Sequence, residues 1–481
     1  MTDEVGRGID VRNSKNEDAE LNIKGDSSST LNVNAKNEAI YSAGDVNISG
    51  EGTIDATSAT DDGIEANGGN LTIKGSGTVT GTGASDGIRA GGDATIDGEG
   101  KVVAKATEDQ GLDVDGDLTI KGGAQVEASS EKQEAIDCDG NIDISGGAQV
   151  EATAKNDTAV SAEGSVKVEN ATLTATGAGY GIYAYKNVNL DHATVTVRVC
   201  ARFDQALGIF TDEDDITIKN GSLVDVLATG NYSSAIRSLN YANGGGGGHH
   251  IYISDSVVKA IARYAKGTSD APNPYVSEID PDEGDKDGRM NTGILAATNE
   301  GVKPAIISIV RSKVTAEGDT AAILAVVTST DGKEMGTIEI KDASVLAPVD
   351  GKVIDYHAKN EHSVGDTTYT TYNDGQLIGT GDATVSDLDD PAVAKSAVIG
   401  TEDEQKPTPK PDEKPGQQPA DDDGQQNLKP ATDKVPAATK PATATKNVPA
   451  TGDASVEGAA ATDLGGIAAL LAGLVARRKR Q

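Results

Sequence analysis

The stretch that decides the fold is AIDCDGNIDISGGAQVEA, residues 135–152. Apolar or small residues alternate with polar ones in three short segments, at Ile136 and Cys138, Ile142 and Ile144, and Val150 and Ala152. Alternation with a period of two predicts strands that each bury one face. The Gly and Asn residues between the segments suit corners, because they adopt positive φ readily. The stretch therefore predicts three strands, one on each side of a triangular coil.

The same pattern recurs at a fixed interval. The leading apolar residue of each copy follows the previous one by 24 residues at Ile40, Ile64, Ile88, Leu112, Ile136 and Val160. Less regular copies lead with Ile9, Ile182, Ile209, Ile236, Ile294 and Ile323. One coil cannot bury its inner face whereas stacked coils can, so the repeat predicts a β-solenoid of about 24 residues per rung. Antiparallel hairpins are disfavoured, since they do not require three segments in constant register.

Composition narrows the function. The chain has 481 residues with 58 Gly, no Trp and only 2 Phe, so its core must be built from thin layers of Ile, Val, Leu and Ala. The formal net charge of −34 excludes the basic surface that nucleic-acid binders need. This strongly negative charge suits an extracellular protein or a protein that binds cations. We expect a monomer. Cys138 should point inward as a buried free thiol, and it is too far from Cys200 for a disulfide.

Several rung phrases resemble a known family. They are Asp61-Asp62-Gly63-Ile64, Ser85-Asp86-Gly87-Ile88 and Asp45-Val46-Asn47-Ile48-Ser49-Gly50-Glu51-Gly52. Over about residues 8–347 the chain is similar to bacterial carbohydrate-binding domain proteins of the pectin-lyase-like type. The resemblance implies an all-β fold, a right-handed single-stranded parallel β-helix with three strands per rung. It also implies a non-catalytic, calcium-containing protein that binds a polysaccharide such as cellulose or polygalacturonate.

The sequence predicts three regions. The β-helix is expected over 1–400, with regular rungs at 38–197, irregular rungs with insertions at 206–347 and a terminal region at 348–400. A disordered spacer rich in Pro, Thr and Lys is expected at 401–446, and a sorting segment at 447–481. Within the irregular rungs lies an insertion, 241–292, whose Gly run and His249-His250 favour a mobile loop over a zinc site.

The last segment resembles the wall-sorting signal of Gram-positive surface proteins. Val448-Pro449-Ala450-Thr451-Gly452 is followed by an apolar run at 464–476 and a basic end at 477–480. The resemblance implies that a sortase cleaves between Thr451 and Gly452 and joins Thr451 to peptidoglycan, giving an extracellular, wall-anchored protein.

Three observations bear on the sorting interpretation: the residue at position 448, the length of the apolar run and the start of the chain. Val448 replaces the usual Leu, and the apolar run spans about 20 Å as a helix against a hydrocarbon core of about 30 Å. The alternative is a disordered tail that ends in a short amphipathic helix. No export signal is visible at the start of the chain, so we expect the N-terminus to be incomplete.

Stacking aligns outward side chains 24 residues apart. One column should contain Glu65, Arg89, Asp113, Asp137 and Ser161, and its neighbour Asn67, Gly91, Asp115, Asp139 and Glu163. Asp113, Asp115, Asp137 and Asp139 should then form a square of carboxylates, to which Asp117 or Glu163 could add. Ca²⁺ takes 6–8 oxygen ligands in loose geometry, so we predict a calcium site there. The alternative is a solvated acidic face with pKa values raised by crowding.

Tyrosines crowd the next rung, at Tyr180, Tyr183 and Tyr185. Flat aromatic faces suit sugar rings, so we predict a carbohydrate-binding platform. The alternative is an aromatic ladder that covers the face.

Three functions remain open. The first is a non-catalytic polysaccharide-binding surface protein. The second is a calcium-dependent polysaccharide lyase, in which Arg89 would be the catalytic base, although an Arg stacked between Glu65 and Asp113 is better explained as a counter-charge. The third is an adhesin or stalk.

Overall fold

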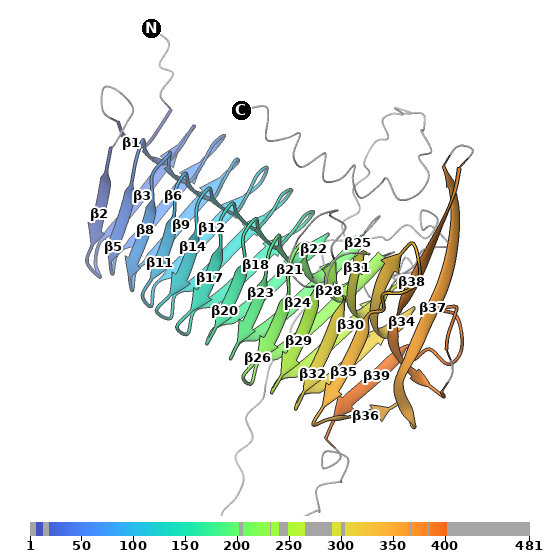
Figure 1. Cartoon of the computed structure of the whole chain (residues 1–481). Helices are drawn as coiled ribbons and strands as arrows, with labels where there is room; N and C mark the ends of the chain where they lie inside the picture. Colours follow the sequence, from blue (N-terminus) through green and yellow to red (C-terminus); the bar gives the residue numbers. More distant parts are fainter. Residues whose placement is uncertain are drawn as a thin grey trace, which may run out of the picture. The chain divides into compact units, whose positions relative to one another are not determined.

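The computed structural model describes residues 6–12, 19–201, 205–230, 232–239, 249–264, 291–299, 304–364, 367–382 and 384–401. These residues form a parallel β-solenoid with three sheets, A, B and C, one on each side of the rung (Figure 1). The fold class predicted from the repeat is confirmed. Within the described ranges, no helix is long and apolar enough to span a membrane.

Sheet A contains, in spatial order, β1 (Ile9–Val11), β4 (Ile40–Ser42), β7 (Ile64–Ala66), β10 (Ile88–Ala90), β13 (Leu112–Val114), β16 (Ile136–Cys138), β19 (Val160–Ala162), β22 (Tyr180–Ala184), β25 (Gln205–Thr211), β28 (Tyr232–Leu239), β31 (Thr292–Asn299), β34 (Ala321–Ser329), β38 (Thr367–Thr380) and β37 (Gly351–Val364). Sheet B contains β2 (Leu21–Gly25), β5 (Val46–Gly50), β8 (Leu71–Gly75), β11 (Ala94–Asp97), β14 (Leu118–Lys121), β17 (Ile142–Ser145), β20 (Val166–Glu169), β23 (Val188–Asp191), β26 (Ile216–Lys219), β29 (His250–Ser254), β32 (Ile306–Val310) and β35 (Thr337–Lys341). Sheet C contains β3 (Thr30–Ala35), β6 (Thr53–Ser58), β9 (Thr78–Gly83), β12 (Lys101–Ala106), β15 (Gln125–Ser130), β18 (Gln149–Ala154), β21 (Thr172–Gly177), β24 (Thr194–Cys200), β27 (Leu223–Thr229), β30 (Val257–Arg263), β33 (Lys313–Gly318), β39 (Ser396–Gly400) and β36 (Ser344–Ala347).

The 24-residue period of the sequence determines which residues pair between neighbouring strands. Ile64 pairs with Ile40 on one side and with Ile88 on the other, in parallel. The pairing continues through the irregular copies, because Ile209 pairs with Ile182 and with Ile236. The uneven spacing is therefore absorbed between strands, and the register predicted from the leading apolar residues holds to Ile323.

The inner face of each strand forms one continuous core. Ile64, Ile136 and Ile142 are fully buried or nearly so, as the alternation predicted. Cys138 also points inward and is a free thiol, as is Cys200. Burial raises the pKa of the Cys138 thiol to about 12, which keeps it protonated.

The corner between sheets B and C requires a left-handed residue in nearly every rung. Gly75 has φ of 120°, and a Cβ there would lie 2.2 Å from the backbone oxygen of Gly50. Only glycine fits such a position. In later rungs residues other than glycine take positive φ, of 45–57°, at Asn170, His192, Asn220, Asp255, Arg311 and Asp342.

The parallel stack ends in antiparallel strands. β38 pairs antiparallel with β34 and with β37, and β39 pairs antiparallel with β33 and β36. The region 348–400, expected as a terminal part of the β-helix, thus extends sheets A and C but not as parallel rungs. Figure 1 shows the long β37–β38 hairpin at the orange end of the stack.

Two further sequence-based interpretations concern His249-His250 and the C-terminal segments. His249 and His250 were interpreted as part of a mobile loop, which is wrong for these two residues. His250 begins β29, and both residues are buried. The predicted spacer and the sorting segment, with Thr451 and Gly452, lie outside the described residues.

Candidate functional site

The outer face of sheet A carries the polar columns that the repeat predicted. We call its part from β4 to β19 the acidic face. Strand pairing places Glu65 beside Arg89, Arg89 beside Asp113, and Asp113 beside Asp137. The column continues through Ser161 to Tyr183. Neighbouring strands in a sheet lie about 4.8 Å apart, so these side chains follow one another at van der Waals spacing.

A third column was not recognised from the sequence. It consists of the residue two positions before each leading apolar residue, at Glu38, Asp62, Asp86, Gln110, Glu134 and Thr158. The side chains link successive rungs. The Asp62 Oδ1 accepts a hydrogen bond of 2.8 Å from the backbone N–H of Asp86, and the Asp86 Oδ1 accepts one of 2.9 Å from Gln110. The sequence signal that could have revealed this column is the acid that recurs before Gly-Ile, as in Asp62-Gly63-Ile64 and Asp86-Gly87-Ile88.

Arg89 is the counter-charge at the centre of the face. Its Nη1 lies 2.7 Å from Asp113 Oδ2 and 3.6 Å from Asp86 Oδ2, and its Nη2 lies 3.4 Å from Asp115 Oδ1. The neighbouring carboxylates raise the guanidinium pKa further, although burial opposes this. Arg89 thus lies within ion-pair distance of three acids of the face, the arrangement expected of a counter-charge.

The four aspartates predicted to bind calcium are brought to neighbouring rungs. Asp113 pairs with Asp137 in the ladder, and the backbone N–H of Asp139 bonds to the carbonyl of Val114, next to Asp115. Arg89 holds Asp113 and Asp115 on one side. Over the part of the chain that the structure describes, no three His, Cys, Asp or Glu side chains gather in a way that could hold a metal ion. Calcium binding stays a prediction that titration must test.

Burial raises the pKa of several carboxyl groups on this face. The pKa of Glu65 rises to about 8, first through desolvation and then through the charges of Asp62 and Glu38. The pKa values of Asp62, Asp86, Asp113 and Glu134 rise for the same first reason. Desolvation outweighs the backbone hydrogen bonds and Arg89, so part of the face holds protons at neutral pH.

The tyrosines form the boundary between the acidic face and an apolar patch. Tyr180, Tyr183 and Phe210 pack with ring centroids 5.7–5.8 Å apart. Tyr180 and Tyr183 are half-buried against a second apolar cluster on the outer face of sheet A, which also includes residues from 385–393. Tyr185 is more accessible, at 36 % exposed, and its hydroxyl donates a hydrogen bond to Glu213. Of the three, Tyr185 is best placed to meet a ligand.

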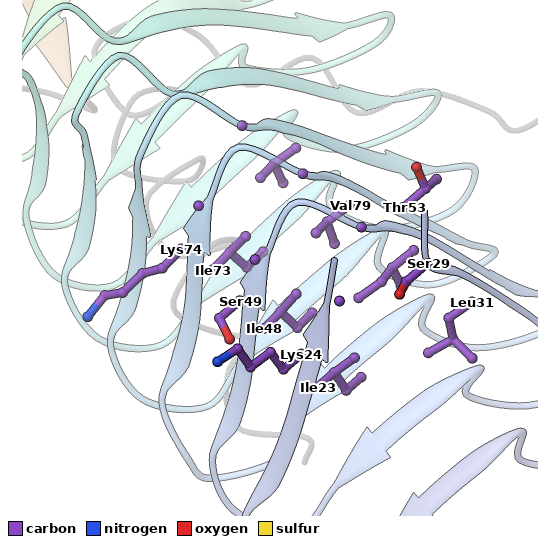
Figure 2. Close-up of a pocket in the computed structure, with 18 of the residues that line it drawn as sticks. Ile23, Lys24, Ser29, Leu31, Ile48, Ser49, Thr53, Ile73, Lys74 and Val79 are labelled. Atoms are coloured by element: carbon purple, nitrogen blue, oxygen red, sulfur yellow. The ribbon is translucent and has the colours of Figure 1, made fainter. Parts of the chain in front are cut away.

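An apolar cavity lies inside the stack at the corner between sheets B and C (Figure 2). Its volume is about 100 Å³, and Ile23, Ile48, Ile73 and Val79 are among its lining residues. Ligand pockets usually span roughly 300–1,000 Å³. This cavity is too small and too apolar for a sugar, so it does not compete with the acidic face as a glycan site.

Comparison with known proteins finds no matching family model, no matching curated protein and no matching solved structure. The function must therefore be argued from the geometry of the face itself.

Proposed function

We propose that this protein is a non-catalytic polysaccharide-binding protein, displayed on a Gram-positive cell wall, that holds its glycan along the acidic face. The supporting observation is the register of polar side chains on sheet A. Asp113 pairs with Asp137 of the next rung, and the same column continues through Ser161 to Tyr183. A linear polymer can meet such a row of hydrogen-bonding groups one rung after another.

A row of polar side chains that repeats from rung to rung fits a polymer better than a small molecule. Carboxylates accept hydrogen bonds from sugar hydroxyls, and tyrosine adds an aromatic surface with a polar tip. Several weak contacts along one polymer add up through effective concentration. The tail motif around Thr451 supports wall display, where such a polymer would be met.

The geometry of Arg89 favours the binding function over the lyase alternative. A catalytic base must lose its proton, whereas Arg89 is held by Asp113 at 2.7 Å and its pKa is raised. We therefore assign Arg89 no catalytic role. Incubation with polygalacturonate would reveal a lyase through the ultraviolet absorbance of unsaturated products.

The test is a glycan array with the full chain, run once with calcium and once with a chelator. We expect retention on at least one polysaccharide. A blank array under both conditions would refute the proposal and favour an adhesin or stalk. Loss of retention in chelator alone would support the predicted calcium site.

A further inference from the structure

The column that contains Arg89 holds a second arginine, Arg237, further along the stack. Strand pairing places Arg237 beside Phe210 in the rung before it and beside Leu295 in the rung after it. Its side chain is only 9 % exposed, and none of the described acids forms an ion pair with it. Of its three nitrogens only Nε is both buried and without a hydrogen bond, so the two Nη atoms stay accessible. A guanidinium is always charged, and burying a charge without a partner is unfavourable.

Arg89 shows what an arginine at this position in the rung is paired with. Three acids of the chain lie within ion-pair distance of it, Asp86, Asp113 and Asp115. The residues in the same register positions around Arg237 are Ser234, Leu295 and Ala297. The same arginine therefore occurs once among carboxylates and once without them, so the chain supplies the anion for Arg89 and not for Arg237.

Asp212, in the rung before Arg237, is an acid on which the charge of Arg237 acts. Burial first and the charge of Glu213 second raise the pKa of Asp212, and Arg237 lowers it by less. Within the described part of the chain, no ion pair joins the two side chains. A carboxyl group with a raised pKa holds its proton more readily, so Asp212 is a poor substitute for the acids around Arg89.

Two hydroxyl groups beside Arg237 also lack partners. Ser234 and Thr292 continue the third column and pair with each other in the ladder. They are 1 % and 0 % exposed, and neither the Ser234 Oγ nor the Thr292 Oγ1 has a hydrogen-bond partner. Buried hydroxyl groups are nearly always hydrogen-bonded, because an unmade bond is unfavourable. In the rung of Arg89, the third-column carboxylate of Asp86 lies 3.6 Å from the guanidinium, so Ser234 is within reach of a group bound to Arg237.

We infer that Arg237, Ser234 and Thr292 bind one carboxylate group of the glycan. The Nε–H and Nη–H groups of a guanidinium match the two oxygens of a carboxylate, and hydroxyl groups can donate to the same oxygens. The Phe210 ring flanks the guanidinium, with its centroid 5.9 Å from Arg237 Cζ, and helps to hold it in place. This inference rests on the proposed function and names the class of glycan, a sugar chain that carries an acidic sugar.

The charge of the molecule limits how many carboxylates that glycan can carry. With a net charge of −34, the protein repels a polymer made only of uronic acids. Asp137 and Arg237 lie four rungs apart in one column, about 19 Å at the spacing of strands. The part of the glycan over the acidic face is therefore neutral, and the acidic sugar lies at or near one end.

The test uses two β-1,4-linked glucose hexamers, one of which ends in a single glucuronic acid while the other ends in glucose. Their binding to the full chain is measured by isothermal titration at neutral pH. We expect the acidic hexamer to bind about ten-fold more tightly. Arg237→Gln should remove this difference and leave binding of the neutral hexamer unchanged. The matched control Arg311→Gln, which removes the same charge from an exposed arginine paired with Asp255, should preserve the difference.

The outcomes separate this inference from the proposed function. Equal binding of the two hexamers, or an unchanged difference between them in Arg237→Gln, overturns the inference while glycan binding stands. Failure to bind either hexamer, with retention of another glycan on the array, has the same meaning. A blank array removes both. The comparison of the hexamers uses the unaltered chain, so it decides the matter even where Arg237→Gln fails to fold.

Discussion

Replacing Glu65 with Gln should change how stability depends on pH. The folded-state pKa of Glu65 is raised from 4.5 to about 8. Below pH 4.5 both the folded and the unfolded chain hold the proton. Between 4.5 and 8 the unfolded chain loses it first, so folding becomes less favourable as the pH rises. Above pH 8 the loss is complete. Glu65→Gln, which cannot ionise, should escape this loss.

The size of the effect follows from the same values. A pKa raised from 4.5 to about 8 corresponds to about 5 kcal/mol at 1.36 kcal/mol per pH unit. Remaining solvent contact and relaxation reduce this to about 2 kcal/mol. Asp62, Asp86 and Arg89 surround the group and remain in the variant, so the difference between the two chains isolates Glu65.

Calorimetric melting at pH 5 and at pH 9 tests this expectation. At pH 5 the two proteins should melt within about a degree of each other, because Gln resembles protonated Glu. At pH 9 the variant should melt a few degrees higher, as about 2 kcal/mol implies for a large domain. The matched control is Glu151→Gln, on an exposed position of β18. Melting curves of variant and wild type that shift in parallel between the two pH values would refute the reasoning.

Three further predictions concern other parts of the fold. Gly75→Ala should lower the free energy of unfolding by about 3 kcal/mol or more, because the new Cβ is strained and clashes with the Gly50 backbone. The control Gly68→Ala, at a φ of 74° with open space around it, should lower it by only about 1 kcal/mol. Equal losses for the two variants in chemical denaturation would contradict this prediction. Cys138, with its pKa raised to about 12, should resist maleimide at pH 8 until the chain is unfolded; rapid labelling of the native protein would argue against its burial. Millimolar calcium should raise the melting temperature if the four aspartates bind it, and Asp137→Asn should abolish the rise; an unchanged melting temperature would reject the site.

The sequence was sufficient for the register because the constraint is local and repeated. A strand that buries every second residue fixes the direction of Ile136 and Cys138, and the 24-residue step then fixes which residues become neighbours. The column Glu65, Arg89, Asp113, Asp137 follows from these two facts alone. It required no knowledge of side-chain conformation, and strand pairing confirms it.

Other features depend on information that the repeat does not contain. Asp62 and Asp86 precede their strands, so the alternation within strands did not point to them. Tyr180 and Tyr183 are partly covered by Phe210 of the next rung and by the apolar cluster to which it belongs, which the alternation within one rung does not reveal. The raised pKa of Glu65 reflects first its burial and then the charges of Asp62 and Glu38, and these became visible only once the neighbouring side chains had been placed.

The antiparallel strands β38 and β39 have a consequence for how the molecule can change in length. Each parallel rung pairs only with the rung before and the rung after it, so duplicating one 24-residue unit in the middle would leave the closing strands and their pairing intact. It would extend the acidic face by about 4.8 Å. The length of the stack can therefore change without a change in its closing strands. A gene that gains or loses whole repeats in register would yield longer or shorter proteins with the same antiparallel end.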